Sequence, residues 1–152
     1  MHLANYLDLV HRAELALADA YREVADAHGD EPDIKSLCHK LASECDRHAA
    51  KLKPFVERYG EEGPEEPERL HQDLFGGTRE GGLGLLRDLH DLYLMATEVD
   101  ISWIVIKQAA QGARDRDLIQ TVEACDKETE MQLRWLQTRI KQAAPEALLV
   151  AP

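Results

Sequence analysis

Four long segments of the chain repeat apolar residues every three to four positions, and this period limits the fold more than any other feature. In the first segment the apolar row consists of Leu3, Leu7, Val10, Leu17, Tyr21 and Val24. A period of 3.6 residues places such side chains on one face of an α-helix. The pattern predicts helices over residues 3–28, 33–59, 83–112 and 117–143, each roughly 40 Å long at 1.5 Å per residue.

The connections between these helices differ in length. The first and the third are short, which favours two helical hairpins of antiparallel neighbours. Residues 60–82 contain six glycines and two prolines and show no sustained period, so we expect a long crossover or a flap there. The sequence therefore predicts an all-α fold, a four-helix bundle of two hairpins joined by a long crossover, in a single domain spanning residues 1–152.

Charge and hydropathy exclude several classes of partner. Twenty-nine acidic and 18 basic residues give a net charge of −11, which repels nucleic acid. The longest apolar run, residues 92–106, is interrupted by Glu98 and Asp100 and is shorter than the roughly 20 residues that span a bilayer. We therefore expect no nucleic-acid partner and no membrane partner.

The N-terminus and the cysteines indicate the compartment. The first residues lack the basic start and apolar block of a secretory signal, and three cysteines are a poor disulfide framework. Cys38, Cys45 and Cys125 each fall on an apolar helix face, where reduced cysteine packs as a small hydrophobe. We expect a cytoplasmic protein.

A few polar side chains fall within or beside the apolar faces. Glu14 continues the apolar row of the first helix, and His48 lies among Leu41, Cys45 and Leu52 in the second. Helical phase adds Glu44 at the flank of the apolar face of the second helix and Asp100 on the apolar face of the third. On the fourth helix Thr129 lies at the centre of the apolar face and Asp126 at its edge. These positions also agree in height along the bundle, so they predict one polar layer.

Two interpretations of this layer remain open. In the first, Glu14, Glu44, His48, Asp100 and Asp126 are ligands of iron or another divalent transition metal, because carboxylate oxygens and an imidazole suit such ions. In the second, the layer is structural: His48 neutralises Glu14 and Thr129 fills the remaining hydrogen bonds, which fixes the helix register.

In hairpin order, helix length and the inward Glu14, the chain resembles the ferritin-like superfamily, which includes rubrerythrins and bacterioferritins. The family pattern is a Glu on the first and third helices and Glu-x-x-His on the second and fourth. Here the second helix offers Glu44-x-x-x-His48, phase favours Asp100 over Glu98 on the third, and the fourth has no histidine. The resemblance implies a single-metal or degenerate site for redox, peroxide or iron handling, with a small-molecule oxidant as a partner.

The third helix carries apolar residues on more than one side, notably Ile101, Trp103, Ile104, Val105 and Ile106. This excess predicts a homo-oligomer, in the commonest case a dimer, unless Leu70, Leu74 and Phe75 of the long connection cover the helix. If no metal binds, the alternative function is a noncatalytic helical bundle that interacts with a protein or a small ligand.

Overall fold

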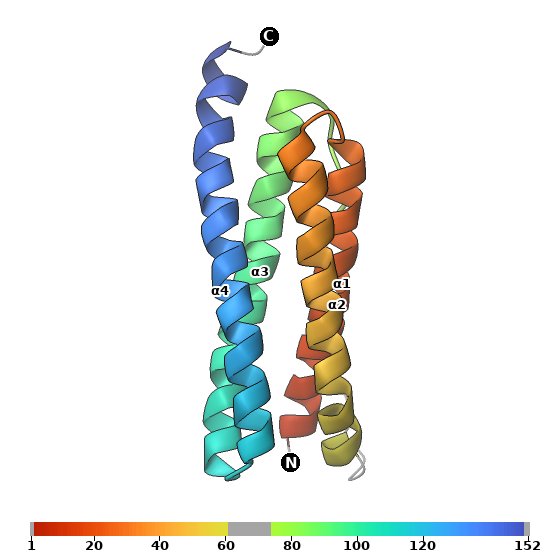
Figure 1. Ribbon diagram of the computed structural model, residues 1–152, viewed down its shortest axis with the longest axis vertical. Coiled ribbons are helices and arrows are strands. Elements are labelled where there is room, and N and C mark those ends of the chain that lie inside the picture. The colour runs from red at the N-terminus through yellow and green to blue at the C-terminus, as the bar shows by residue number, and fades with distance from the viewer. Residues whose placement is uncertain (1, 61–73, 151–152) are drawn as a thin grey trace.

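The computed structural model describes residues 2–60 and 74–150 and contains four long α-helices (Figure 1). They are α1 (Leu3–Ala27), α2 (Pro32–Gly60), α3 (Gly81–Gly112) and α4 (Arg116–Pro145), and a short π-helical turn, η1 (Glu146–Val150), follows α4. The described ranges contain no β-strand, so the prediction of an all-α bundle is confirmed. Each helix begins and ends within two residues of the position predicted from the apolar period.

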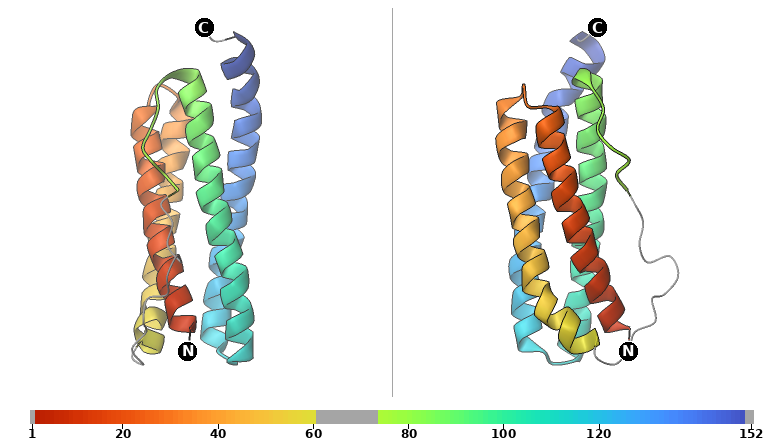
Figure 2. Two further views of the ribbon diagram at one scale, coloured as in Figure 1. Left: turned by 180° about the vertical axis from the view of Figure 1, so that it is seen from behind. Right: turned by 90° about the vertical axis from the view of Figure 1, so that its right-hand side faces the viewer.

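Neighbouring helices of the bundle run in opposite directions. α1 packs along α2, α3 along α4, α1 beside α3, and α2 beside α4. The end of α2 and the start of α3 lie at opposite ends of the bundle, as Figures 1 and 2 show. Of the predicted crossover over residues 60–82, residues 61–73, including Leu70, lie outside the described part of the chain.

The described end of this connection, at residues 74 and 75, packs against α1 and α3. Leu74 and Phe75 pack against the core and line a pocket with Ala16, Ala20 and Met95. These two residues therefore cover a region between α1 and α3 instead of the apolar stretch around Ile104.

A buried aspartate fixes the start of α3. Asp88 is 0% exposed and accepts from the backbone N–H of Arg79 at 3.0 Å and from its guanidinium at 2.8 Å. The Nε2 atom of His28, which follows α1, lies 2.7 Å from the same carboxylate. A Cβ on Gly84 would lie 2.9 Å from the carbonyl carbon of Arg79, so only glycine permits this close approach. The cluster joins α1, the connection and α3.

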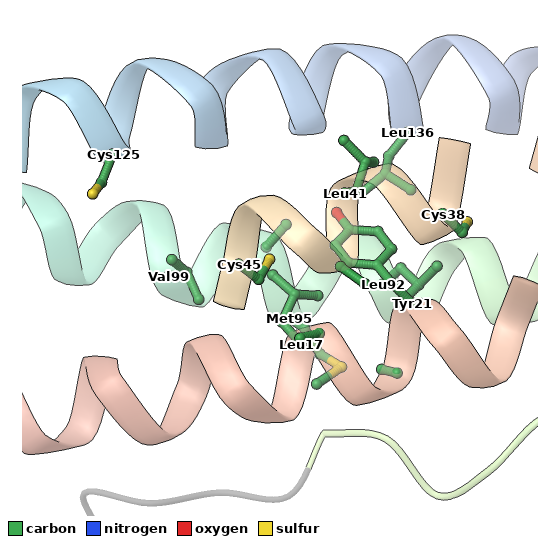
Figure 3. Packing of buried hydrophobic residues seen from close by; sticks show 14 of the residues in the cluster. Leu17, Tyr21, Cys38, Leu41, Cys45, Leu92, Met95, Val99, Cys125 and Leu136 are labelled. Atoms are coloured by element: carbon green, nitrogen blue, oxygen red, sulfur yellow. The ribbon is translucent and has the colours of Figure 1, made fainter. Parts of the chain in front are cut away.

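The core is built from the predicted apolar faces and includes all three cysteines (Figure 3). Cys38, Cys45 and Cys125 are buried free thiols, as the sequence predicted. Burial raises the pKa of Cys38 and that of Cys125 to about 12, so both stay protonated and pack as apolar groups.

α3 divides its apolar residues between the core and the surface. Trp103 and Ile106 are 0% exposed, whereas Ile101 is 55% and Ile104 54% exposed. At the other end of the chain, Leu148, Leu149 and Val150 of η1 are exposed at the projecting end of α4. Among the described helices, none is both long and apolar enough to cross a membrane.

Candidate functional site

Glu14 and His48 meet in the bundle core. Glu14 on α1 is 1% exposed and His48 on α2 is 0% exposed. The Nδ1 atom of His48 lies 3.2 Å from Oε1 of Glu14. Both side chains belong to apolar faces that must point inward, and α1 packs along α2, so the helical phase brings this pair together.

A second carboxylate, from Glu128 on α4, reaches the opposite edge of the imidazole. Oε1 of Glu128 lies 3.1 Å from Nε2 of His48, and its Oε2 accepts from the Arg47 guanidinium at 2.9 Å. The Glu128 side chain is 32% exposed and that of Arg47 is 54% exposed. A row of contacts therefore leads from Glu14 in the core through His48 and Glu128 to Arg47 at the surface.

Sequence reasoning did not include Glu128 among the site residues. The apolar stripe of the fourth helix is centred on Thr129, so Glu128 falls at its flank and extends inward along its side chain. One signal points to it: CDRH at 45–48 recurs as CDKE at 125–128, which places Glu128 at the position equivalent to His48.

Glu14 keeps one carboxylate oxygen without a partner. Its Oε2 atom is buried and has no well-formed hydrogen bond, and the weakly donating Cys45 thiol beside this carboxylate acts to lower its pKa against the effect of burial, so desolvation of the oxygen is only partly offset. Burial raises the pKa of Glu14, although the hydrogen bond with His48 opposes this rise. Burial lowers the pKa of His48, but the hydrogen bonds and charges of Glu14 and Glu128 outweigh burial and raise it overall. Both shifts favour a proton shared within the Glu14–His48 pair.

An aromatic side chain closes the layer from α3. The rings of Trp103 and His48 meet edge to face with centroids 6.3 Å apart. The indole Nε1–H donates to Oγ1 of Thr129 at 3.2 Å, and the Thr129 hydroxyl donates to the carbonyl of Cys125 at 3.0 Å. Thr129 is buried as predicted, but its hydrogen bonds go to Trp103 and Cys125.

Glu44 belongs to an adjacent hydrogen-bonded group. Its Oε1 accepts from the Gln132 side-chain amide at 3.2 Å, and Oε1 of Gln132 accepts from the Tyr21 hydroxyl at 3.0 Å. Gln132 and Tyr21 are both buried. Glu44 thus contributes to a polar contact between α2 and α4 through Gln132.

Asp100 and Asp126 lie together at the contact of α3 with α4. With Glu130 they offer three carboxylate oxygens within 4.8 Å of one another, and this is the single set of three or more candidate metal ligands within the described ranges. Oδ1 of Asp126 is buried without a partner. Burial, and then the hydrogen bond and charge of Asp100, raise the pKa of Asp126 to about 7.

The five residues predicted as ligands therefore do not form one compact set. Glu14 and His48 are joined in the core, Asp100 and Asp126 are joined with Glu130, and Glu44 is bonded to Gln132. Equal height along the bundle does not bring side chains together, because the side chains also have to point toward the same place in the cross-section of the bundle.

The chain was compared with family models, with curated proteins and with solved structures, and none of the three comparisons found a match.

Proposed function

We propose that the protein is a metal-binding helical bundle of ferritin-like arrangement, in which Glu14 and His48 hold one divalent transition metal ion in the core. The observation that carries this proposal is the Oε2 atom of Glu14, which is buried without a hydrogen-bond partner beside an imidazole nitrogen 3.2 Å from Oε1 of the same carboxylate. A cation bound to this oxygen would satisfy it and would take the place of the proton in the Glu14–His48 pair.

The two donor types, a carboxylate oxygen and an imidazole nitrogen, would supply two ligands to iron, manganese or zinc. Carboxylate oxygen favours the harder ions, and imidazole suits zinc and iron. When bound, iron would supply redox chemistry towards a small-molecule oxidant such as a peroxide. The chain's own residues exclude water from the pair, because Glu14 and His48 are almost completely buried, and Glu128 holds the outer edge of the imidazole.

Three further parts of the proposal concern the setting of this site. α2 ends at one end of the bundle and α3 begins at the other (Figures 1 and 2). This placement favours two hairpins joined by a crossover, as in ferritin-like bundles. The three buried free thiols suit a reducing, cytoplasmic compartment. The exposed stripe around Ile101 and Ile104 favours a homodimer through α3.

One observation favours the alternative of a noncatalytic bundle with a structural polar layer. Both ring nitrogens of His48 already face carboxylates, so His48 is paired without an ion. In that case the layer fixes the register of α1, α2 and α4, and the function resides in a partner-binding surface.

Elemental analysis of protein purified without chelator separates these functions. We expect about one transition metal ion per chain, lost in Glu14→Gln and in His48→Ala. Glu14→Gln preserves the shape of the side chain and removes the charge that a cation requires. Asp126→Asn is the matched control at the other carboxylate cluster and should keep the metal. A metal lost only in Asp126→Asn would transfer the site to α3 and α4, and a metal-free parent protein would support the structural layer.

A further inference from the structure

We infer that two copies of the chain pair through α3 in antiparallel orientation, with Arg87 of one copy beside Glu98 of the other. This inference rests on the homodimer named in the proposed function, and it specifies the orientation and the register of the two helices. It does not depend on the proposed metal ion, so the two proposals can fail separately.

The exposed face of α3 is continuous along most of the helix. At about 100° per residue, its side chains start within roughly 60° of one line along the helix. Most of them are large and apolar, which suits contact with another apolar helix face better than contact with water. This α3 stripe consists of the exposed residues Leu83, Arg87, His90, Leu94, Ile101, Ile104 and Val105, with the half-buried Thr97 and Glu98 among them.

The charges of the α3 stripe determine which orientation two copies can adopt. Arg87 lies near the start of α3, with its guanidinium 2.9 Å from Nδ1 of His90, and Glu98 lies about 16 Å further along the helix. In a twofold dimer of parallel helices each residue meets its own copy, so Arg87 would face Arg87 and Glu98 would face Glu98. The antiparallel dimer instead brings Arg87 and Glu98 together at two symmetric places, which is the complementary arrangement.

The pairing of Arg87 with Glu98 also aligns the apolar residues of the two helices. Leu83 precedes Arg87 by about one helical turn. Ile101 follows Glu98 by nearly one turn, so it lies about level with Leu83 of the other copy. Leu94 of each copy lies close to the twofold axis. Apolar contacts therefore lie on both sides of each ion pair.

The projecting end of α4 extends the apolar surface beyond the start of α3 (Figure 1). α3 and α4 are joined by a turn at residues 113–115, so residues equally far from this turn lie at about the same height. By this measure the exposed Leu148 and Leu149 of η1 lie just beyond Gly81, and η1 contacts α3. In the antiparallel register the same height belongs to Ile104 and Val105 of the other copy. The end of one chain thus covers the last exposed part of the partner copy's α3 stripe.

Charge reversal tests the ion pairs, with the dimer dissociation constant measured by sedimentation. We expect Arg87→Glu and Glu98→Arg each to weaken the dimer about 10-fold, because each places like charges together at both symmetric contacts. The double variant exchanges the two charges and should return to within about threefold of the parent. Lys40→Glu, on the exposed side of α2, is the matched control and should leave the dimer unchanged. A double variant as weak as the single variants would overturn the register.

Cysteine cross-linking tests the orientation without changing a charge. The variant with both Leu83→Cys and Ile101→Cys should form disulfide-linked dimers with oxidised glutathione, because a disulfide needs adjacent residues. Each single variant should stay unlinked, because its two new thiols lie roughly 25–28 Å apart along the helices. The parent, whose cysteines are buried, is the control.

Two results would overturn the inference in different ways. Linked dimers of the single variant Ile101→Cys would indicate parallel helices, and the homodimer itself would stand. A monomeric parent protein in sedimentation would overturn both the register and the homodimer of the proposed function. The metal content of the parent protein is measured separately and is affected by neither result.

Discussion

Asp126→Asn should stabilise the metal-free protein at pH 8 and have little effect at pH 4. Asp126, Asp100 and Glu130 place carboxylate oxygens within 4.8 Å of one another. At 4.8 Å, two unit charges repel by about 0.9 kcal/mol in water and by about 3.5 kcal/mol at an effective dielectric constant of 20. Asp126 is only partly buried, so solvent screening reduces the expected gain to about 1–2 kcal/mol.

The sign of this pH dependence follows from the pKa of Asp126. Burial and Asp100 raise that pKa from 3.8 to about 7, so the folded state holds a proton that the unfolded state releases above pH 4. The stability that comes from this proton is fully present below about pH 4 and is lost as the pH rises through 7. An asparagine does not titrate, so the variant should lack this loss.

Urea unfolding with a chelator present, at pH 4 and at pH 8, measures both effects. The gain at pH 8 should shrink in 1 M salt, because exposed charges are screened there. Glu130→Gln is the matched control: Glu130 is more exposed, so neutralising it should give a smaller gain. An Asp126→Asn variant that is less stable than the parent at pH 8, or equally stabilised at both pH values, would refute the reasoning.

Three other predictions follow from separate parts of the structure. Asp88→Ala removes the buried partner of His28 and should cost about 3 kcal/mol of unfolding free energy in urea; a loss below 1 kcal/mol would contradict the clustered hydrogen bonds. Sedimentation at tens of micromolar should show a dimer that Ile101→Asp dissociates and Leu15→Asp, on the exposed side of α1, does not; a monomeric parent would exclude the α3 interface. Zn²⁺ at about 100 times its Kd should raise the Tm by about 5–10 °C in the parent but not in Glu14→Gln, and equal shifts in both would place the ion elsewhere.

The apolar period predicted the helices well because burial in a bundle acts on one face of each helix. The same reasoning indicated that Glu14 and His48 point inward, since each interrupts an otherwise apolar row. It was less informative at the helix ends: α4 continues through Pro145 into η1, beyond the predicted end at residue 143. A proline removes a backbone donor, and the exposed end of a helix tolerates that loss.

Helical phase alone could not determine which polar groups meet. Asp100 and Asp126 were expected in the same layer as His48, but they leave α3 and α4 near the surface and pair with Glu130. Helical phase also failed to identify Glu128. Its backbone lies off the apolar stripe of α4, but its long side chain reaches Nε2 of His48. Helical phase gives the direction in which a side chain leaves the backbone, but the terminal carboxylate of a long glutamate side chain can lie elsewhere.

The most direct test of the central claim is a crystal structure of the protein grown with Co²⁺, with anomalous scattering measured at the cobalt edge. We expect one strong anomalous peak between the carboxylate of Glu14 and Nδ1 of His48. A peak found only among Asp100, Asp126 and Glu130, or no peak at either place, would contradict the claim that Glu14 and His48 bind a metal ion.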